Sequence, residues 1–415
     1  MPLDPKRTVR DLKELRELSS DTNGAQRVAW TDTWLSAREW FQTKLTGLPV
    51  EFHQDAAGNN WFTVHGRSPE ALLLGGHLDS VPNGGWLDGS LGVLASLEVL
   101  RRMVDEFSGE PPVTIRLVDW ADEEGARFGR SLFGSSAFAG THSIEADRSR
   151  TDKDGIRLED AVRRCEIEIE RIGEASRERE NACAYLELHI EQGPVLERME
   201  LPLAAVLGTK GVERHTVTFF GQEAHSGSTP MSVRRDALAA AAKLALEIRP
   251  IAVRHKDAVC TMGSVKTFPG IVTAVVGRCE ATLDQRDLDP GVLDAMHREA
   301  IEASERFARE ERCTVEWSRI WNIEPVPFHS ELIGLCRDAI REVAGEAPAL
   351  PSGPLHDAAE VSRAGIPTVM MFVQSLGGIS HNKIEDTKEE YIELSVAALD
   401  RLATKTARWI QDGGE

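Results

Sequence analysis

A short apolar run at residues 72–76, Leu-Leu-Leu-Gly-Gly, is followed at once by His77 and Asp79. Another carboxylate, Asp88, follows in the glycine-rich stretch 84–89. A run of this length is typical of a buried strand, and open α/β sheets bind ligands beyond the carboxyl ends of their strands. A histidine and two carboxylates at such a position predict part of a metal site. In the alternative reading, Asp88 caps a helix and His77 is an incidental loop residue.

Further strand-like runs end in the same way, at residues 113–118, 185–190 and 368–373. Taken singly, each polar group has an ordinary explanation: a buried strand histidine, a helix cap or a polar loop. Their occurrence at the ends of successive strands is much less expected by chance, and it predicts one shared site. The groups are His77, Asp88, Glu123, Glu124, His189 and His381.

Imidazole and carboxylate together are suitable ligands for Zn, Mn, Co or Ni. Two such ions need one bridging carboxylate and roughly two further ligands each, which this set supplies. Of the adjacent Glu123 and Glu124, one can bind metal while the other stays free as the general base that takes a proton from water. The sequence therefore predicts two divalent metal ions per subunit.

The sequence pattern changes between residues 211 and 323. Strand and helix patterns there follow the order β-α-β-β-α-β, which is the ferredoxin-like arrangement, with one helix expected to stop at Pro250 and another to be capped by Asp289. We therefore predict an α/β catalytic domain in two parts, residues 1–210 and 324–415, that is interrupted by an inserted α+β domain at residues 211–323.

The bulk composition excludes some classes of protein. The 48 basic and 67 acidic side chains give a formal charge of −19, which argues against a nucleic-acid surface. No apolar run approaches the ~18 residues of a membrane span, and the first twenty residues lack the apolar core of a signal peptide. The six cysteines form no C-x-x-C pair. Free thiols suit a reducing compartment, so we expect a cytoplasmic protein with no membrane or nucleic-acid partner.

The chain contains the motifs His77-x-Asp79, Gly84-Gly85-x-x-Asp88-Gly89, Glu123-Glu124-Gly125-x-Arg127-Phe128, His189-Ile190-Glu191-Gln192-Gly193-Pro194 and Ser380-His381-x-x-x-Glu385. These motifs resemble those of the M20 metallopeptidase family, over nearly the whole chain. More narrowly, they resemble its hydantoinase/carbamoylase branch, which includes N-carbamoyl-L-amino acid hydrolases, β-ureidopropionases and allantoate amidohydrolases. The resemblance implies a metal-dependent exopeptidase-like α/β domain with an inserted lid and dimerisation domain.

The resemblance also implies a role for each metal-site residue. Asp88 would bridge the two metals, with His77 and His189 completing one ion and Glu124 and His381 the other. Glu123 would be the general base. Asp79 would lie behind His77, where a carboxylate fixes the tautomer of the ring and raises its basicity.

At the substrate end, the stretch 221–231 resembles the lid motif of the branch, in which His225 would donate to the developing oxyanion. Arg286 matches the residue that grips the carboxylate of the substrate. Gln192 matches a residue that contacts the ureido group, and His356 matches one that lines the pocket. From the residues alone, the preferred reading of His225 is a loop histidine ahead of a helix, and Arg286 has the alternative reading of an exposed strand arginine.

The chain also departs from the branch at several positions: Thr273 stands where relatives have Asn, Ser226 where they have Ala, and Pro354-Leu355 where they have Ala-Gly. The substrate is therefore less constrained than the metal site. We expect a hydrolase that cleaves a linear C–N amide in a carboxylate-bearing carbamoyl or ureido compound, most simply an N-carbamoyl-L-amino acid. The alternatives are an allantoate amidohydrolase, an M20 aminopeptidase or deacylase, and a metal-binding scaffold without turnover. The resemblance further implies a homodimer through the inserted domain, with His225 acting in its own subunit or across the dimer.

Overall fold

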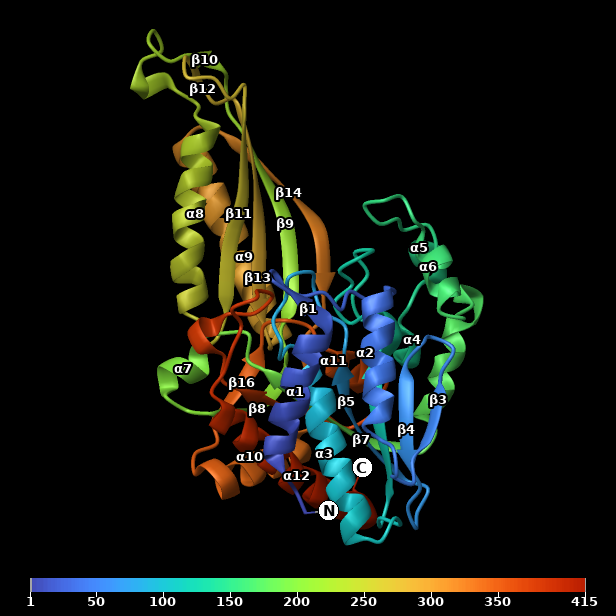
Figure 1. Ribbon diagram of the computed structural model, residues 1–415. Helices are drawn as coiled ribbons and strands as arrows, with labels where there is room; N and C mark the ends of the chain where they lie inside the picture. Colours follow the sequence, from blue (N-terminus) through green and yellow to red (C-terminus); the bar gives the residue numbers. More distant parts are fainter. Residues whose placement is uncertain (1, 415) are drawn as a thin grey trace. The chain divides into compact units, whose positions relative to one another are not determined.

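The computed structural model of the protein describes residues 2–414 (Figure 1). The chain forms two compact units. Residues 2–207 and 328–414 make up unit 1, and residues 208–327 make up unit 2. The segment that we expected as the insertion, residues 211–323, lies within unit 2.

Unit 1 is built on a mixed sheet with the strand order β8-β17-β7-β5-β6-β4-β3, in which β16 also pairs with β8. The central strands β17, β7, β5 and β6 run parallel to one another, and the outer strands are antiparallel to their neighbours. The central strands are buried along most of their length, as expected for a sheet covered on both faces. The strands of the whole sheet are β3 (Glu51–Gln54), β4 (Asn60–Val64), β5 (Ala71–His77), β6 (Thr114–Trp120), β7 (Ala182–Ile190), β8 (Leu203–Thr209), β16 (Ala349–Ser352) and β17 (Thr368–Val373).

Four long helices share one hydrophobic core with this sheet: α1 (Pro5–Ser19), α3 (Ser90–Glu106), α10 (Ser330–Ala344) and α12 (Glu389–Gln411). Leu72 and Leu74 of β5 belong to this core together with the apolar residues of α3, which recur at helical spacing. A second core surrounds Trp30 and Trp34 and is built by α2 (Asp32–Thr43), α4 (Phe133–Ala139), α6 (Leu158–Arg164) and η1 (Ile169–Arg179). The remaining elements of unit 1 are short: β1 (Ser20–Asp21), β2 (Gly24–Ala25), α5 (Ile144–Asp147), α7 (Val195–Met199), α11 (Asp357–Arg363) and η3 (Leu376–Gly378).

Unit 2 contains an antiparallel sheet with the order β11-β13-β9-β14, and α8 and α9 pack against it around a core of their own. The elements occur along the chain as β-α-β-β-α-β, and this strand order is that of the ferredoxin-like fold. The expectation of a mixed α/β protein with a ferredoxin-like insertion is confirmed. The bounds are β9 (Gly211–Phe220), α8 (Ala237–Val253), β11 (Val259–Phe268), β13 (Arg278–Asp287), α9 (Pro290–Glu310) and β14 (Thr314–Ile323), with the short elements β10 (Ala224–His225), η2 (Met231–Val233), β12 (Ala274–Val275) and β15 (Val326–Pro327).

The ends of the unit 2 helices test two local predictions. Asp289 caps α9 as expected, since its carboxylate accepts a hydrogen bond from the backbone N–H of Gly291. Helix α8 does not stop at Pro250 but continues to Val253. That prediction was wrong because Pro250 lies in the last turn of α8. The hydrogen bond that its missing N–H removes is therefore near the end of the helix, and the residues that follow Pro250 remain helical.

Two expectations from composition can be compared with the described residues. All six cysteines are free thiols. No described helix has both the length and the apolar character needed to cross a bilayer.

Candidate functional site

The carboxyl ends of the central parallel strands of unit 1 carry the side chains that the sequence singled out. His77 is the last residue of β5, where it lies beside Trp120 at the end of β6, and His189 is the penultimate residue of β7. Glu123 and Glu124 follow β6, and His381 follows β17. Because parallel strands present their carboxyl ends at one edge of the sheet, these residues meet there.

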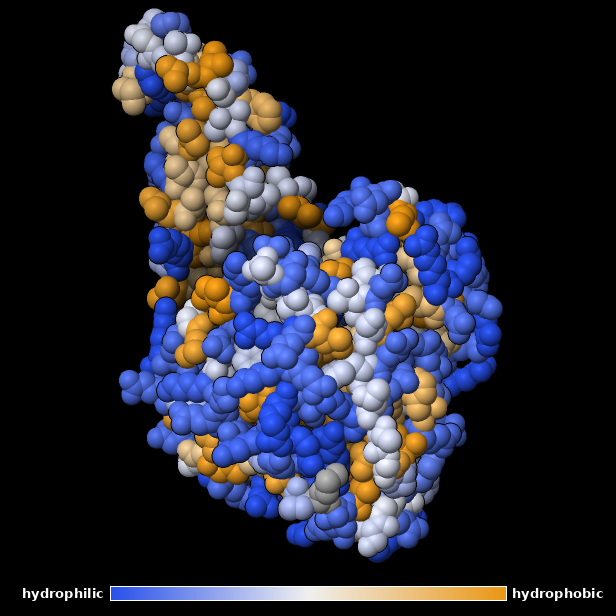
Figure 2. Space-filling model, viewed as in Figure 1, coloured by the Kyte–Doolittle hydropathy of each residue, from blue (hydrophilic) through white to orange (hydrophobic). Residues whose placement is uncertain are grey.

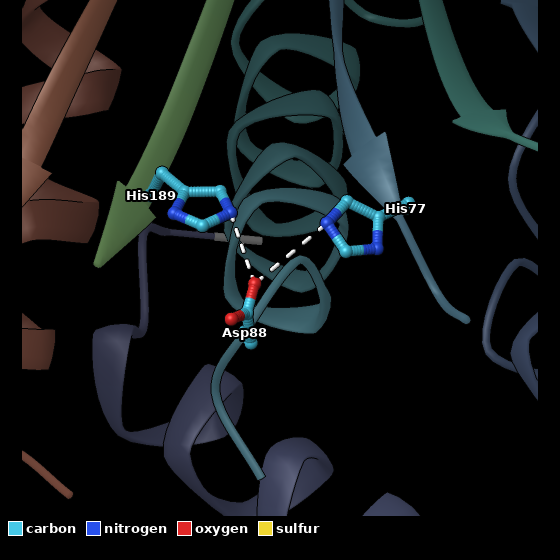
Figure 3. Close-up of side chains that lie close together, drawn as sticks. All are labelled: His77, Asp88 and His189. Atoms are coloured by element: carbon cyan, nitrogen blue, oxygen red, sulfur yellow. Dashed lines mark ion pairs between the residues drawn. The ribbon is translucent and has the colours of Figure 1, made fainter. Parts of the chain in front are cut away.

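His77, Asp88 and His189 form the first cluster (Figure 3). One carboxylate oxygen of Asp88, Oδ1, lies 3.1 Å from Nε2 of His189 and 3.8 Å from Nε2 of His77. All three residues are buried. Two ring nitrogens therefore point at one carboxylate oxygen in a site from which water is largely excluded.

The other ring nitrogens determine the tautomers of these histidines. Nδ1 of His77 donates to the carbonyl oxygen of Asp79 at 3.1 Å, and Nδ1 of His189 donates to that of Ile190 at 2.9 Å. A carbonyl can only accept, so each Nδ1 carries a proton, and Nε2 is the ring atom that is left to face Asp88. Within residues 2–414 neither Nε2 has a hydrogen-bond partner. An imidazole with its proton on Nδ1 can offer Nε2 to a metal ion, and a cation beside the Asp88 carboxylate would be attracted by both groups, so these donor atoms fit a metal ion.

Asp88, Glu124 and His381 form a second cluster on the other oxygen of Asp88. Nε2 of His381 lies 3.5 Å from Oδ2 of Asp88 and 3.3 Å from Oε2 of Glu124. Oε1 of Glu124 is buried and has no hydrogen-bond partner in the described chain. Asp88 is thus common to both clusters, which is the arrangement that a bridging carboxylate needs.

Asp79 holds the turn that carries the two glutamates. Its carboxylate oxygens accept hydrogen bonds from the backbone N–H groups of Glu123 and Glu124, both at 3.2 Å. We expected this carboxylate to hold the ring of His77, but the atom of Asp79 that accepts from His77 is the backbone carbonyl, and the nearer carboxylate oxygen is 3.6 Å away. Asp79 therefore connects the histidine of one strand to the glutamates of the next.

The turn at Asp88 leaves no room for a side chain at the next residue. A Cβ atom at Gly89 would lie 2.3 Å from the ring of His77, and Gly89 has a φ of +63°. Helix α3 has no side-chain cap, so the alternative reading of Asp88 as a helix cap is wrong. Its carboxylate instead accepts from Ser380 at 2.7 Å and from Gln192 at 2.8 Å.

The electrostatics of the site reflect its burial. Burial raises the pKa of Glu123 well above its usual value, against the opposing effect of His77, whose Nε2 lies 3.8 Å from Oε2 of Glu123. Burial also raises the pKa of Glu385 to about 7 and that of Asp122 to about 8. A raised carboxyl pKa indicates a strong proton acceptor, which is the property a general base requires.

Gln192 and His356, expected at the substrate, lie against the clusters. The side-chain amide of Gln192 donates to Asp88, while its Oε1 atom is buried without a partner among the described residues. The ring of His356 packs edge-on against that of His189 with centroids 4.4 Å apart, and its Nε2 contacts the hydroxyl of Ser352 at 3.0 Å. Burial, helped by the neighbouring His189, holds the pKa of His356 well below its usual range, so the ring is neutral.

His225 and Arg286 belong to unit 2. His225 is exposed on β10, which pairs with β12, and its Nδ1 accepts from the backbone N–H of Gly227 at 3.1 Å. Arg286 is half-buried on β13 and donates to Asp284 at 2.8 Å. The residues that the structure brings together at the clusters are those of unit 1.

Some buried polar residues near the clusters were not anticipated. Glu187 on β7 accepts from the hydroxyl of Tyr185, and both carboxylate oxygens of Asp357 are buried without a hydrogen-bond partner in residues 2–414. Glu187, His189 and His356 also lie close enough to share a cation. A glutamate inside an otherwise buried strand was a signal that the sequence contained, because an unpaired buried carboxylate is costly.

Comparison with known proteins adds independent information. Residues 73–405 match the peptidase family M20/M25/M40. The chain is 36% identical over 384 residues to an N-carbamoyl-L-amino acid amidohydrolase of Geobacillus stearothermophilus, covering 91% of this chain and 93% of that protein. It is 30% identical to an allantoate amidohydrolase of Bacillus subtilis, covering 94% of each. A solved amidase of the hydantoinase/carbamoylase family from Burkholderia multivorans superposes with a TM-score of 0.86 at 31% identity, covering 98% of both chains.

Proposed function

The chain belongs to the peptidase family M20/M25/M40 and to its hydantoinase/carbamoylase branch, and from this premise we propose that it hydrolyses a linear C–N amide of a carboxylate-bearing carbamoyl compound. For an N-carbamoyl-L-amino acid, one water is consumed, and the products are the amino acid, carbon dioxide and ammonia. The observation that carries the proposal is that the buried Nε2 atoms of His77 and His189 both face one carboxylate oxygen of Asp88.

We assign the metal-binding residues as two groups that share Asp88. His77 and His189 would hold one divalent ion, and Glu124 and His381 would hold the other, with Zn, Mn, Co or Ni as suitable metals. When bound, such ions polarise a carbonyl and lower the pKa of water toward ~7. We assign proton transfer, substrate binding and stabilisation of the oxyanion to the side chains described in the next two paragraphs.

Glu123 is the proposed general base. It is buried beside His77, and nothing in the described chain ties its carboxylate into a salt bridge with Lys or Arg. It would take a proton from the attacking water and return it to the leaving nitrogen, so that the nitrogen departs as a neutral amine or ammonia. Asp79 supports this role by fixing the backbone of Glu123.

The substrate end is proposed from the unit 1 residues and from the two unit 2 residues. The Oε1 atom of Gln192 is left to accept a ureido N–H, and the neutral His356 lines the same region. Arg286 would pair with the substrate carboxylate, and His225 would donate to the oxyanion. Asp284, which now accepts from Arg286, would then compete with the substrate for that guanidinium.

A second candidate substrate is allantoate, which also carries a carboxylate and ureido groups. It is favoured by the similarity to allantoate amidohydrolases, which covers as much of the chain as the similarity to the N-carbamoyl-L-amino acid amidohydrolases. The wider family reactions, aminopeptidase and deacylase, are less favoured because the Gln192-Gly193-Pro194 block and Arg286 resemble those of the hydantoinase/carbamoylase branch.

The test is a screen for release of ammonia. Protein loaded with Mn, Co or Zn is incubated with N-carbamoyl-L-amino acids, β-ureidopropionate, allantoate and N-acetyl amino acids. We expect ammonia from a carbamoyl acid or from allantoate, and no cleavage of the acetyl compounds. Turnover of acetyl compounds alone would favour a deacylase, and metal binding without any turnover would favour the scaffold alternative.

We further propose a cytoplasmic homodimer through unit 2. The free cysteines support a reducing compartment. The sheet of unit 2 has two edge strands, β11 and β14, that carry exposed apolar side chains, among them Val265 and Trp321. Apolar patches are visible on the surface of this unit (Figure 2). Light scattering on the purified protein should give twice the chain mass of 45.7 kDa.

A further inference from the structure

Glu385 is a buried carboxylate that none of the roles above uses, although it lies beside Asp88. Only 2% of its surface is exposed. One oxygen, Oε1, accepts hydrogen bonds from the backbone N–H groups of Leu87 and Asp88, both at 3.0 Å. No lysine or arginine forms a salt bridge with it among residues 2–414. A buried carboxylate bonded in this way fixes the backbone that it contacts.

The other oxygen of Glu385 connects the same point to the loop that carries His381. The hydroxyl of Ser380 lies 3.1 Å from Oε2 of Glu385 and donates to Oδ2 of Asp88 at 2.7 Å. Ser380 directly precedes His381, whose φ of 55° is in the left-handed region and costs energy for a non-glycine residue. Glu385 thus contacts the backbone of the shared carboxylate and, through Ser380, the loop of another ligand.

The opposite loop is shaped to admit this carboxylate. A Cβ atom at Gly85 would lie 2.1 Å from Oε1 of Glu385 and 2.2 Å from its Cδ, and these are its nearest neighbours. The backbone of Gly85 is not in the left-handed region. The absence of a side chain at this position is therefore explained by room for Glu385 and not by the conformation of the turn.

We propose that Glu385 is a positioning residue that sets the carboxylate of Asp88 and the loop of His381 at the separation that two metal ions require. It is not an assigned metal ligand, and it acts through its hydrogen bonds to the backbone of Leu87 and Asp88 and through its contact with Ser380. The inference rests on the proposed metal site and deepens it, because it names the residue that aligns the two ligand groups. Removing such a hydrogen-bonded partner of a ligand typically weakens metal binding by 10–100-fold.

The test measures Zn²⁺ affinity of the full-length apo-protein by competition with a chelating indicator. We expect Glu385→Ala to weaken binding by about 10–100-fold. Glu385→Gln should stay within about 3-fold of the wild type, because its amide oxygen keeps both backbone donors and its NH2 group donates to Ser380, which still donates to Asp88. Rescue by this isosteric variant separates positioning from a general loss of folding. Asp386→Asn is the matched control, since this exposed neighbour bonds to Trp86 and not to Asp88.

Gly85→Ala provides an independent variant with an intact Glu385. The new methyl group should displace the carboxylate and weaken Zn²⁺ binding much as Glu385→Ala does. In the double variant the two effects should not add, because both act through the same contact. If Glu385→Ala fails to fold, the Gly85→Ala result decides the question.

The outcomes distinguish this inference from the proposed function. If the wild type binds no Zn²⁺, the metal site itself is wrong. If the wild type binds Zn²⁺ and both Glu385→Ala and Gly85→Ala bind it equally well, the metal site stands and the role of Glu385 is overturned. Glu385→Gln as weak as Glu385→Ala would also overturn it, because hydrogen-bond geometry would then not be what matters.

Discussion

The two oxygens of Asp88 face different neighbours. Oδ1 faces the ring nitrogens of His77 and His189, while Oδ2 accepts from Ser380 and Gln192. Burial would raise the pKa of Asp88, but His189 and His77 outweigh it and hold this pKa below its usual value. A carboxylate that stays ionised in a buried position is suited to link two cations.

Glu123→Gln is the residue-scale prediction. The amide has nearly the same shape but cannot accept a proton, so we expect the turnover number to fall by roughly 10²–10⁴-fold. Metal content, measured by mass spectrometry after dialysis, should not change, because Glu123 is not an assigned ligand. Turnover that persists at the wild-type rate would show that another group is the base.

At this scale the sequence predicted which residues would meet, because each one ends or follows an apolar run. It did not predict what they bond to. The carboxylate of Asp79 is bound by backbone N–H groups of the next strand's turn, and Gln192 bonds to Asp88. Such contacts depend on loop conformation, including the left-handed φ of 56° at Gln192, which no spacing rule reveals.

Among the connecting elements, the loop after β2 contributes a fully buried arginine behind the site. Arg27 is 1% exposed and donates to the carbonyl of Leu78 and to the hydroxyls of Ser19 and Ser90. It therefore joins α1, the end of β5 and the start of α3. Burial lowers its pKa to about 10, against the opposing effect of nearby carboxylates, so it remains charged at neutral pH.

Arg27→Met should destabilise unit 1 substantially. The variant leaves three buried acceptors without a donor, and each such group costs about 1–3 kcal/mol, so we expect a loss of roughly 3 kcal/mol or more in the free energy of unfolding. Urea unfolding measures this loss. The exposed Arg298→Met serves as the control and should change the free energy by less than about 0.5 kcal/mol. Equal urea midpoints for Arg27→Met and the wild type would contradict the stabilising role of Arg27.

Nothing in the sequence around Arg27 indicated this role. Helices and strands were predictable from periodicity, since amphipathic spacing is a local property. Arg27 lies about fifty residues from Leu78, and its partners are two hydroxyls and a carbonyl, which are present in every sequence. Contacts of this kind arise only when the elements pack.

In the whole molecule, unit 2 has a core of its own and its own titratable groups. The rings of His215 on β9 and His297 on α9 stack with centroids 3.9 Å apart, and both pack against Trp317. His215 contacts Glu213, and Nε2 of His297 is buried without a hydrogen-bond partner in the described residues. Burial lowers the pKa of both rings below 6.5, and for His297 the neighbouring His215 adds to the effect.

The pair predicts that unit 2 loses stability in mild acid. Because both pKa values are lower in the folded state, the unfolded state binds more protons, and stability is complete above pH 6.5 and is lost as the pH falls through the lowered values. Thermal unfolding between pH 8 and pH 5 should show a falling midpoint. In His297→Phe, which keeps the aromatic stacking, the fall should be smaller, and an unchanged slope would exclude the pair as its cause.

The ferredoxin-like insertion was predictable as a whole because its alternating strands and capped helices follow local rules. The roles of His225 and Arg286 were not, because they come from the family resemblance and their structural contacts are local to unit 2. The role of a lid residue depends on its contacts with a bound substrate. The spacing of residues along the chain describes only how the chain folds. These two roles therefore stay proposals.

The chain enters and leaves unit 2 through neighbouring residues, since Thr209 pairs with Val326 and Gly208 with Pro327. An insertion whose ends are adjacent can be exchanged, lengthened or deleted at one junction without rethreading the host domain. Every residue assigned here to a metal ion lies outside that junction. Exchange of unit 2 at this junction would therefore leave the proposed ion-binding residues of unit 1 unaltered.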